Sequence, residues 1–496
     1  MPGKYARKKR RSIVPLLITI LILLGLVGAG LFFYEDIAAM LMPAETEPSG
    51  EAAVLPTQTN AASTAEVPTT EVPTTAPPTT VPPETEPLIT ATASFTVTGD
   101  LLMHRPVFDD YENKETGEYD FDPMMEFLEE YVSPADYAIT NLETTFCGLD
   151  NGFGYSGNPF FNCPDALADT CVKVGFDMLL TANNHCYDTR VPGVKRTLEI
   201  LENVGLDGLG TRASTEVPNY LIKEINGIKV GMTCYTFETP RQGSNLPCLN
   251  AIQLSYEGAD LVNTFHYSYL KEFYKEIGQQ IQEMNEAGAE AILVFMHWGE
   301  EYELSANDYQ RKIAQKLCDM GVDVILGGHP HVIQPVELLT ATEDENHKTL
   351  CLYSAGNLIS NQRAEEMRMK TGHTEDGLFF NFTLAKYTDG TVLVQTVDAI
   401  PIWVQIESYR YGYHILPLDD STRDQWKEKY GIDDIVFADC EDSYDRTMKL
   451  VGPGIEEANK YYAQANSDIV YRLNNPHLFS EPTTATEATE TTAAAE

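Results

Sequence analysis

The stretch VDVILGGHPH, residues 322–331, begins as an apolar run suited to a buried strand and ends with two histidines. Two glycines after the run let the backbone turn sharply where the strand ends. His329 and His331, separated only by Pro330, can therefore converge on one point beyond the strand's carboxyl end. A metal ion is the obvious occupant of that point, and a surface loop that happens to carry two histidines is the alternative.

The rest of the chain around this stretch has the alternating pattern of an α/β domain, with apolar, β-rich runs separated by helical stretches. Seven runs are expected to be strands, at residues 94–98, 136–140, 176–181, 229–235, 290–296, 322–326 and 349–354. Helices are expected at residues 123–132, 194–205, 269–289, 307–321 and 454–467. A turn signal at residues 388–390 predicts antiparallel strands late in the domain.

The chain is expected to divide into six segments. They are a basic cytoplasmic segment at 1–12, a transmembrane helix at 13–34, a disordered stalk at 35–90, the α/β domain at 91–402, a mixed C-terminal extension at 403–478 and a disordered tail at 479–496. The stalk and tail consist mainly of Thr, Pro, Ala and Glu. Such a composition buries too little apolar surface to offset the entropy lost on ordering.

The uncharged run at 13–34 reaches roughly 33 Å at about 1.5 Å per residue, which is enough to span a bilayer. The basic cluster before it is expected to stay in the cytoplasm, which places the main domain outside the cell. A cleaved signal peptide is the alternative, because small residues at 28–30 could form a processing site. The length of the run favours an uncleaved, single-pass anchor.

The net charge and the cysteine content limit the partners and the kinds of site that the chain is expected to have. A formal net charge of −40 argues against nucleic acid as a partner, because phosphates bind basic surfaces. The same charge repels polyanions, so an anionic polymer would need local positive charge to bind. The nine cysteines are odd in number and scattered, and they predict neither a disulfide framework nor a CxxC zinc site.

Polar side chains follow six of the expected strands, at the points where those strands end. They include Asp100, Glu143, Asn183, Asn184, His185, His297, His329, His331 and Asn357. The carboxyl ends of strands in an open α/β sheet share one crevice, so these groups are expected to meet. Each has an ordinary alternative: Asp100 could cap a helix, Asn184 could satisfy a loop, and His297 could be a core residue. Their coincidence at six strand ends favours a common site.

Carboxylate, amide oxygen and imidazole are ligands for hard or borderline divalent ions, so Mn, Fe, Zn and Mg are all candidates. A pair of ions held this way would polarise a phosphoryl or acyl oxygen and generate hydroxide near neutral pH. His185, next to Asn184, would then protonate a leaving group. Arg105 is placed to meet an anionic group, although a surface arginine is the more common fate.

Six motifs carry a family resemblance: GDLLMHR, NLETTF, TANNHCYD, HWGEEY, GGHPHVIQPVE and YSAGNLI, in this order over residues 94–360. They resemble the CapA family of capsule and poly-γ-glutamate synthesis proteins, which look like relatives of calcineurin-like metallophosphoesterases. The resemblance implies a four-layer α/β/β/α metallophosphoesterase-like sandwich. It also implies a membrane-anchored, extracytoplasmic protein that helps to make or export an anionic surface polymer.

The resemblance assigns roles residue by residue. The implied metal ligands are Asp100, Glu143, Asn184, His297, His329 and His331, and the implied catalytic histidine is His185. Two positions depart from the phosphoesterase pattern: Glu143 stands where a bridging aspartate is usual, and Leu102 stands where a histidine is usual. His104 lies nearby in the sequence but is not the motif histidine. One metal position therefore has one ligand fewer than the pattern supplies.

Two functional hypotheses follow. The first is a metal-dependent phosphoesterase-like hydrolase that acts on an anionic polymer or its lipid-linked precursor at the cell envelope. The second is a non-catalytic accessory protein whose crevice binds polymer or the subunits of a membrane synthase. The paired histidines at 329 and 331 favour the first hypothesis, and Leu102 favours the second.

Overall fold

The computed structural model describes residues 88–367, 370–408 and 411–479. The expected cytoplasmic segment, the transmembrane run at 13–34, nearly all of the stalk and all but the first residue of the tail lie outside these ranges. Within them, none of the helices combines the length and the apolar character that crossing a bilayer requires. The first strand, β1 (Ile89–Leu101), begins two residues inside the expected stalk.

An eight-stranded sheet contains the N-terminal strands. Its order is β17 (Tyr411–Pro417), β16 (Val392–Ser408), β15 (Asp376–Tyr387), β1, β2 (Tyr137–Leu142), β3 (Met178–Leu180) and β4 (Asp207–Leu209), with β14 (Asn357–Ile359) paired to β1. Strands β1 to β4 are parallel, and β15 to β17 are antiparallel. The hairpin expected at 388–390 connects β15 to β16.

A seven-stranded sheet contains the strand that precedes the two histidines. Its order is β12 (Val336–Thr340), β13 (Lys348–Leu352), β11 (Val324–Gly328), β10 (Ala291–His297), β6 (Ile228–Phe237) and β5 (Leu221–Ile225), with β9 (Thr264–Phe265) paired to β6. A separate small hairpin joins β7 (Cys248–Leu249) to β8 (Ile252–Gln253). Strands β6, β10, β11 and β13 are parallel, so their carboxyl ends lie at one edge of the sheet.

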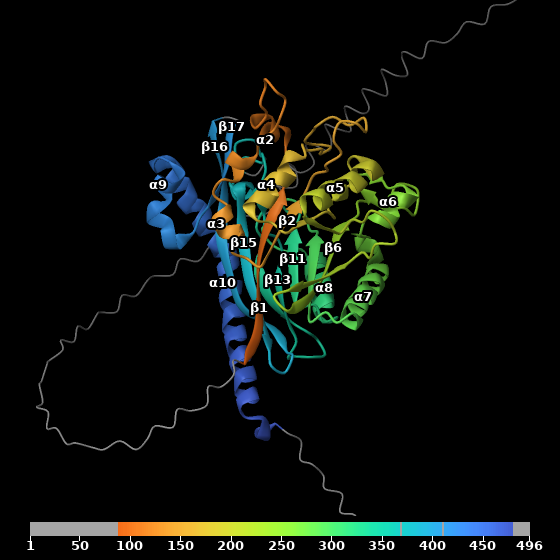
Figure 1. Ribbon diagram of the computed structural model, residues 1–496, viewed down its shortest axis with the longest axis vertical. Helices are drawn as coiled ribbons and strands as arrows, with labels where there is room; N and C mark the ends of the chain where they lie inside the picture. Colours follow the sequence, from red (N-terminus) through yellow and green to blue (C-terminus); the bar gives the residue numbers. More distant parts are fainter. Residues whose placement is uncertain (1–87, 368–369, 409–410, 480–496) are drawn as a thin grey trace, which may run out of the picture. The chain divides into compact units, whose positions relative to one another are not determined.

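Side chains that alternate along each strand pack the two sheets against each other. In β10, Leu293 and Phe295 join the core that also contains Phe95 of β1, while Val294 and Met296 face the opposite way. The outward residues of β10 pack with α7 (Leu270–Glu286) and α8 (Asp308–Cys318). The outer face of the eight-stranded sheet packs with α3 (Glu129–Val132), α4 (Ala166–Val174) and α5 (Arg190–Val204). The order of layers is helices, sheet, sheet, helices (Figure 1).

The long helix α10 (Asp434–Asn474) packs against β16 of one sheet and β12 of the other (Figure 1). Its side chains Val451, Ile455, Ala458 and Tyr462 belong to the core between the sheets. Gly454 lies so close to β12 that a Cβ there would meet the Val336 carbonyl oxygen at 1.9 Å. The C-terminal segment is therefore part of the sandwich core, and residue 403, where the extension was expected to start, lies inside β16.

The remaining elements connect or cover these layers. They are α2 (Arg105–Asp110), η1 (Asp122–Met125), α6 (Tyr256–Leu261), η2 (Tyr267–Tyr269), η3 (His373–Glu375), η4 (Asp420–Gln425), α9 (Trp426–Tyr430) and η5 (Pro476–Leu478). All nine cysteines lie in the described residues, buried and free.

The expected α/β class is confirmed, and each of the seven expected strands overlaps an observed one. The sequence did not reveal β4, whose three residues, Asp207–Leu209, form no apolar run. It also predicted only residues 454–467 of α10, because Gly452 and Pro453 interrupt the helical pattern in the middle of that helix.

Replacing Gly454 with alanine should lower the free energy of unfolding by about 1–3 kcal/mol, because α10 would have to move away from β12. Gly452→Ala is the matched control, since a Cβ at Gly452 meets no atom within 4 Å. That variant should change stability by less than about 1 kcal/mol. Denaturant unfolding of the full chain, followed by tryptophan fluorescence, measures both. Equal effects of the two substitutions would contradict the close approach.

Candidate metal centre

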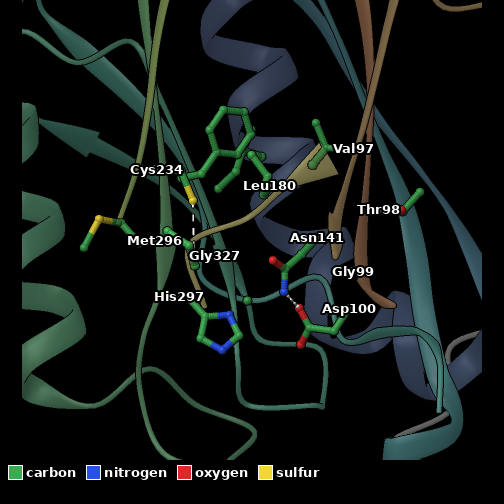
Figure 2. Close-up of a pocket in the computed structure, with 14 residues that line it drawn as sticks. Val97, Thr98, Gly99, Asp100, Asn141, Leu180, Cys234, Met296, His297 and Gly327 are labelled. Carbon is green, nitrogen blue, oxygen red and sulfur yellow. Dashed lines mark hydrogen bonds between the residues drawn. The ribbon is translucent and has the colours of Figure 1, made fainter. Parts of the chain in front are cut away.

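The carboxyl ends of the central strands of both sheets meet at one place. Asp100 lies near the end of β1, and His297 is the last residue of β10. The backbone N–H of His329, just after β11, donates to Oδ2 of Asp100 across the two sheets at 3.2 Å. Asp100 and His297 line one pocket between these strand ends (Figure 2). The crevice is thus formed by two sheets, as the resemblance to a four-layer sandwich implied, whereas the strand-end pattern alone predicted one open sheet.

Asp100 is fully buried and has a partner on each side. Its Oδ1 accepts a hydrogen bond from Nδ2 of Asn141 at 2.7 Å (Figure 2). Its Oδ2 lies 3.3 Å from Nδ1 of His331. Oδ1 of Asn357 lies 3.1 Å from the same His331 nitrogen. Asp100 and His331 are therefore held together by neighbouring amides.

Glu143 follows β2 directly and is also fully buried. Neither of its carboxylate oxygens makes a hydrogen bond to any described residue. Its Oε1 lies 3.5 Å from Nε2 of His297 and 3.8 Å from Nε2 of His331. A carboxylate buried in this way is costly unless a cation or a set of donors faces it.

The other five implied metal ligands lie near this carboxylate. The ligand atoms of Glu143, His297 and His329 lie within 4.8 Å of one another, and so do those of Asp100, Glu143 and His331. Oδ1 of Asn184 lies 2.8 Å from Nε2 of His297, so the amide oxygen joins the first of these triads. Both triads are buried, and Glu143 is common to them.

The histidine loop has a constrained backbone. His329 and His331 have φ angles of 97° and 55°, which residues other than glycine rarely adopt. A Cβ on Gly327 would meet the Tyr353 carbonyl oxygen at 1.9 Å, so β11 can approach β13 only with glycine there. Backbone strain of this kind persists where the surrounding structure enforces it, commonly at functional sites.

Burial and neighbouring charges set the protonation of the cluster. Burial alone would raise the pKa of Asp100, but the hydrogen bond from His331 and the charge of His297 bring it below its usual value. Burial, together with the charges of His297 and His331, keeps the pKa of His329 well below its usual value. His329 is therefore neutral, which is the form that binds metal.

His331 behaves in the opposite way. Burial alone would lower its pKa, but the carboxylates of Glu143 and Asp100 raise the pKa of His331 to about 9. Acceptors on both edges of the ring, Asn357 and Asp100 at Nδ1 and Glu143 near Nε2, are consistent with a protonated imidazole. Before an ion can bind this ring, one proton must leave.

The chemistry of this donor set fits a divalent ion. It offers carboxylate oxygens, an amide oxygen and imidazole nitrogens, and no cysteine belongs to the triads. The unpartnered oxygens of Glu143 and the unpartnered Nδ1 of His329 are buried groups that a cation would satisfy. The donor set does not distinguish among Mn, Fe, Zn and Mg.

His185 stands beside the cluster with its own orienting partner. Its Nδ1 lies 2.8 Å from Oδ2 of Asp188, a fully buried carboxylate. Because an ionised carboxylate only accepts hydrogen bonds, Nδ1 donates, and Nε2 is left free to accept. The ring of Phe161 packs edge-on against His185 at 4.5 Å between centroids. His185 is thus held in one tautomer and one orientation.

Asn250 connects His185 to the ligand Asn184. It lies in the two-residue turn of the β7–β8 hairpin, where Asn250 and Ala251 have φ angles of 45° and 61°. Its Oδ1 accepts from Nδ2 of Asn184 at 3.2 Å, and its Nδ2 lies 3.3 Å from Nε2 of His185. This contact turns the amide oxygen of Asn184 toward His297.

Three other residues that the sequence singled out near Asp100 lie differently. Arg105 begins α2, its side chain is 68% exposed, and it pairs with Asp109 at 3.0 Å, so the structure does not join it to the cluster. Leu102, at the usual histidine position, is buried. His104 hydrogen-bonds through Nδ1 with the backbone N–H of Asn361, and burial, together with the charge of His331, lowers the pKa of His104 to about 3.

Sequence reasoning missed Asp188 and Asn250 as site residues. Asp188 carried a detectable signal, since it follows His185 by three residues in the motif TANNHCYD. Asn250 carried none, because it lies in a separate hairpin that only the tertiary fold brings to the cluster.

The cluster lies in the part of the chain that matches a known protein family. Residues 94–362, just over half of the chain, match the family described as bacterial capsule synthesis protein PGA_cap. The chain is 25% identical over 345 residues to the PGA biosynthesis protein CapA of Bacillus subtilis (strain 168), which covers 68% of this chain and 80% of that protein. It is 24% identical over 326 residues to the capsule biosynthesis protein CapA of Bacillus anthracis, which covers 63% and 67%. All cluster residues lie within the matched range.

Adding a divalent ion to metal-free protein should raise its stability, by about 2.7 kcal/mol at a free ion concentration one hundred times the Kd. Glu143→Gln should lose most of this gain, because both buried triads contain Glu143. Glu303→Gln, an exposed neighbour outside the triads, should behave as the unmodified chain. Thermal unfolding with Mn²⁺ or with a chelator measures the difference, and an equal gain in both variants would contradict the assignment.

Binding an ion at His331 should release close to one proton at neutral pH, because the pKa of His331 is about 9 in the metal-free protein. The apparent affinity should then increase about tenfold per pH unit between about pH 6 and 8. Titration calorimetry in buffers of different ionisation enthalpy counts the released protons. An affinity that stays constant over this range would argue against His331 as a ligand.

Proposed function

The chain belongs to the bacterial capsule synthesis protein family PGA_cap, so its resemblance to CapA proteins is confirmed, and we propose that it works in capsule or PGA synthesis. In this proposal the protein is a divalent-metal hydrolase of the phosphoesterase type. The single observation that supports the hydrolase is that Glu143 is buried with no hydrogen-bond partner among the described residues and shares two buried triads with four other implied ligands. Such a carboxylate has a physical reason to be there if a cation binds beside it.

The four-layer arrangement supports a metallophosphoesterase-like sandwich. Two sheets pack face to face, with helices on both outer surfaces. The ends of several strands then place their ligands in one crevice. Along the chain, these ligands follow the order of the phosphoesterase pattern. Glu143 takes the place of the bridging aspartate, and it is the residue that the two buried triads share.

The chain's own residues have distinct tasks in this reaction. When bound, a divalent ion polarises a phosphoryl or acyl oxygen and lowers the pKa of a coordinated water. In its doubly protonated form, His185 donates the Nε2 proton to the leaving group and becomes neutral, while Asp188 accepts from Nδ1 and holds the ring for that step. Asn250 keeps the Asn184 amide oxygen directed into the cluster and contacts His185 on the same side. Phe161 and Phe237 form apolar walls beside the histidine rings.

The proposed substrate is an anionic surface polymer or its lipid-linked precursor. The net charge of −40 gives the protein no overall attraction for a polyanion. Arg105 is already paired with Asp109, so it adds little positive charge at the cluster. Bound divalent ions would supply the local positive charge that such a substrate needs.

The proposed location is the cell membrane. The apolar run at 13–34 would act as a single-pass anchor, with residues 1–12 in the cytoplasm and the main domain outside. Both segments lie outside the described residues, so only their composition supports this proposed location. Subunits of a membrane synthase are the proposed protein partners, and the acidic balance argues against nucleic acid.

One observation favours a second candidate function. Leu102 is buried where the phosphoesterase pattern supplies a metal-binding histidine. A site with one ligand fewer could bind polymer or synthase subunits without hydrolysing anything. In that case the protein would be an accessory subunit, and its anchor and stalk would be essential while His185 would not.

The full chain with Mn²⁺ should hydrolyse a phosphodiester, a phosphomonoester or a γ-glutamyl amide. His185→Ala should lower kcat by about 10²–10⁴-fold without loss of bound metal, because His185 acts on protons and the ligands remain. His414→Ala, a histidine on β17 outside the cluster, should retain full activity.

The same variants separate the two candidate functions in cells. The hydrolase requires that His185→Ala abolish surface polymer production. Normal polymer from that variant, together with loss of polymer when residues 13–34 are replaced, would support the accessory role and overturn the hydrolase.

A further inference from the structure

A third group of ligand atoms lies at the solvent side of the cluster. The ligand atoms of Glu301, His329 and His331 lie within 4.8 Å of one another. Glu301 is exposed, whereas every member of the other two triads is buried. Neither the family resemblance nor the phosphoesterase pattern assigns a role to Glu301.

The backbone on both sides of Glu301 is fastened to the histidine loop. The N–H of Trp298 donates to the Gly328 carbonyl at 3.1 Å, and the N–H of Tyr302 donates to the Pro330 carbonyl at 2.8 Å. Further along, Nε2 of Gln334 donates to the Glu303 carbonyl at 2.8 Å. The position of Glu301 beside the two histidines is therefore built by the fold, although its side chain is exposed.

A buried nitrogen of this group points to a ligand. Nδ1 of His329 has no hydrogen-bond partner among the described residues, although His329 is only 4% exposed. A buried polar atom is normally paired, and a cation would supply the partner that the described residues do not.

We propose that Glu301, His329 and His331 form an outer position for a divalent metal ion, with Glu301 as a metal ligand. The inference rests on the proposed metal site and adds a ligand to it. Leu102 leaves the Asp100 and His331 side with one ligand fewer than the phosphoesterase pattern supplies. Glu301 adds a carboxylate oxygen on the side of His331.

The exposure of Glu301 gives the outer position a distinct property. His329 and His331 also belong to the buried triads, so an ion at the outer position competes for ligands with the inner ones. An ion arriving from solvent meets the exposed carboxylate before it reaches the buried ligands. The outer position therefore binds its ion more weakly and exchanges it more readily, and it is the position open to a substrate oxygen.

The test is a Mn²⁺ titration of the full chain after metal removal, followed by calorimetry and by the Mn²⁺ electron paramagnetic resonance signal. Glu301→Gln should weaken the lowest-affinity Mn²⁺ site at least about tenfold and leave the tightest site unchanged. Glu300→Gln is the matched control, because Glu300 is the adjacent glutamate, is also exposed and belongs to none of the three groups. Equal unfolding temperatures of both variants in chelator show that folding is unaffected.

The outcomes separate this inference from the proposed function. If the unmodified chain binds no divalent ion, the metal site itself is wrong and both proposals fall. If the unmodified chain binds Mn²⁺ and Glu301→Gln gives the same isotherm and resonance signal as Glu300→Gln, only the outer position is wrong. A selective loss at the weakest site in Glu301→Gln establishes Glu301 as a ligand without any assay of activity.

Discussion

The burial of Glu143 is the constraint on which the site depends. A carboxylate removed from water costs several kcal/mol unless positive charge or hydrogen-bond donors surround it. Neither oxygen accepts a hydrogen bond from any residue that the structure describes, and the ring nitrogens of His297 and His331 lie 3.5 and 3.8 Å from Oε1. The charges of two neighbouring ligands also depend on each other. In the metal-free protein, Asp100 and His331 each stabilise the charge of the other.

Two packed sheets make such a site possible. Strand β1 supplies Asp100 from one sheet, while β10 and β11 supply the histidines from the other, and the backbone of His329 bonds directly to Asp100. The close approach of β11 to β13 requires Gly327, and the turn that follows places His329 and His331 in left-handed backbone conformations. Rigid strand ends thus impose a geometry that a free loop would not hold.

Charge acts on two scales in this protein. The net charge of −40 repels polyanions, and screening confines that repulsion to within roughly 8 Å of the surface at physiological salt. Within the crevice, bound divalent ions would make the local charge of the metal site positive. The proposed binding of an acidic polymer would therefore depend on the bound ions and not on the charge of the surrounding surface.

The order of residues alone determined the α/β class, seven of the strands and the polar residues that follow six of them, because these follow from local periodicity and from what comes directly after each apolar run. Only the tertiary structure decided which strands belong to each of the two sheets that the resemblance implied, since sheet membership depends on long-range pairing. It also brought Asp188, Asn250 and Glu301 to the cluster and left Arg105 outside it. Side-chain direction and the packing of distant segments set those positions, and neither is encoded in spacing along the chain.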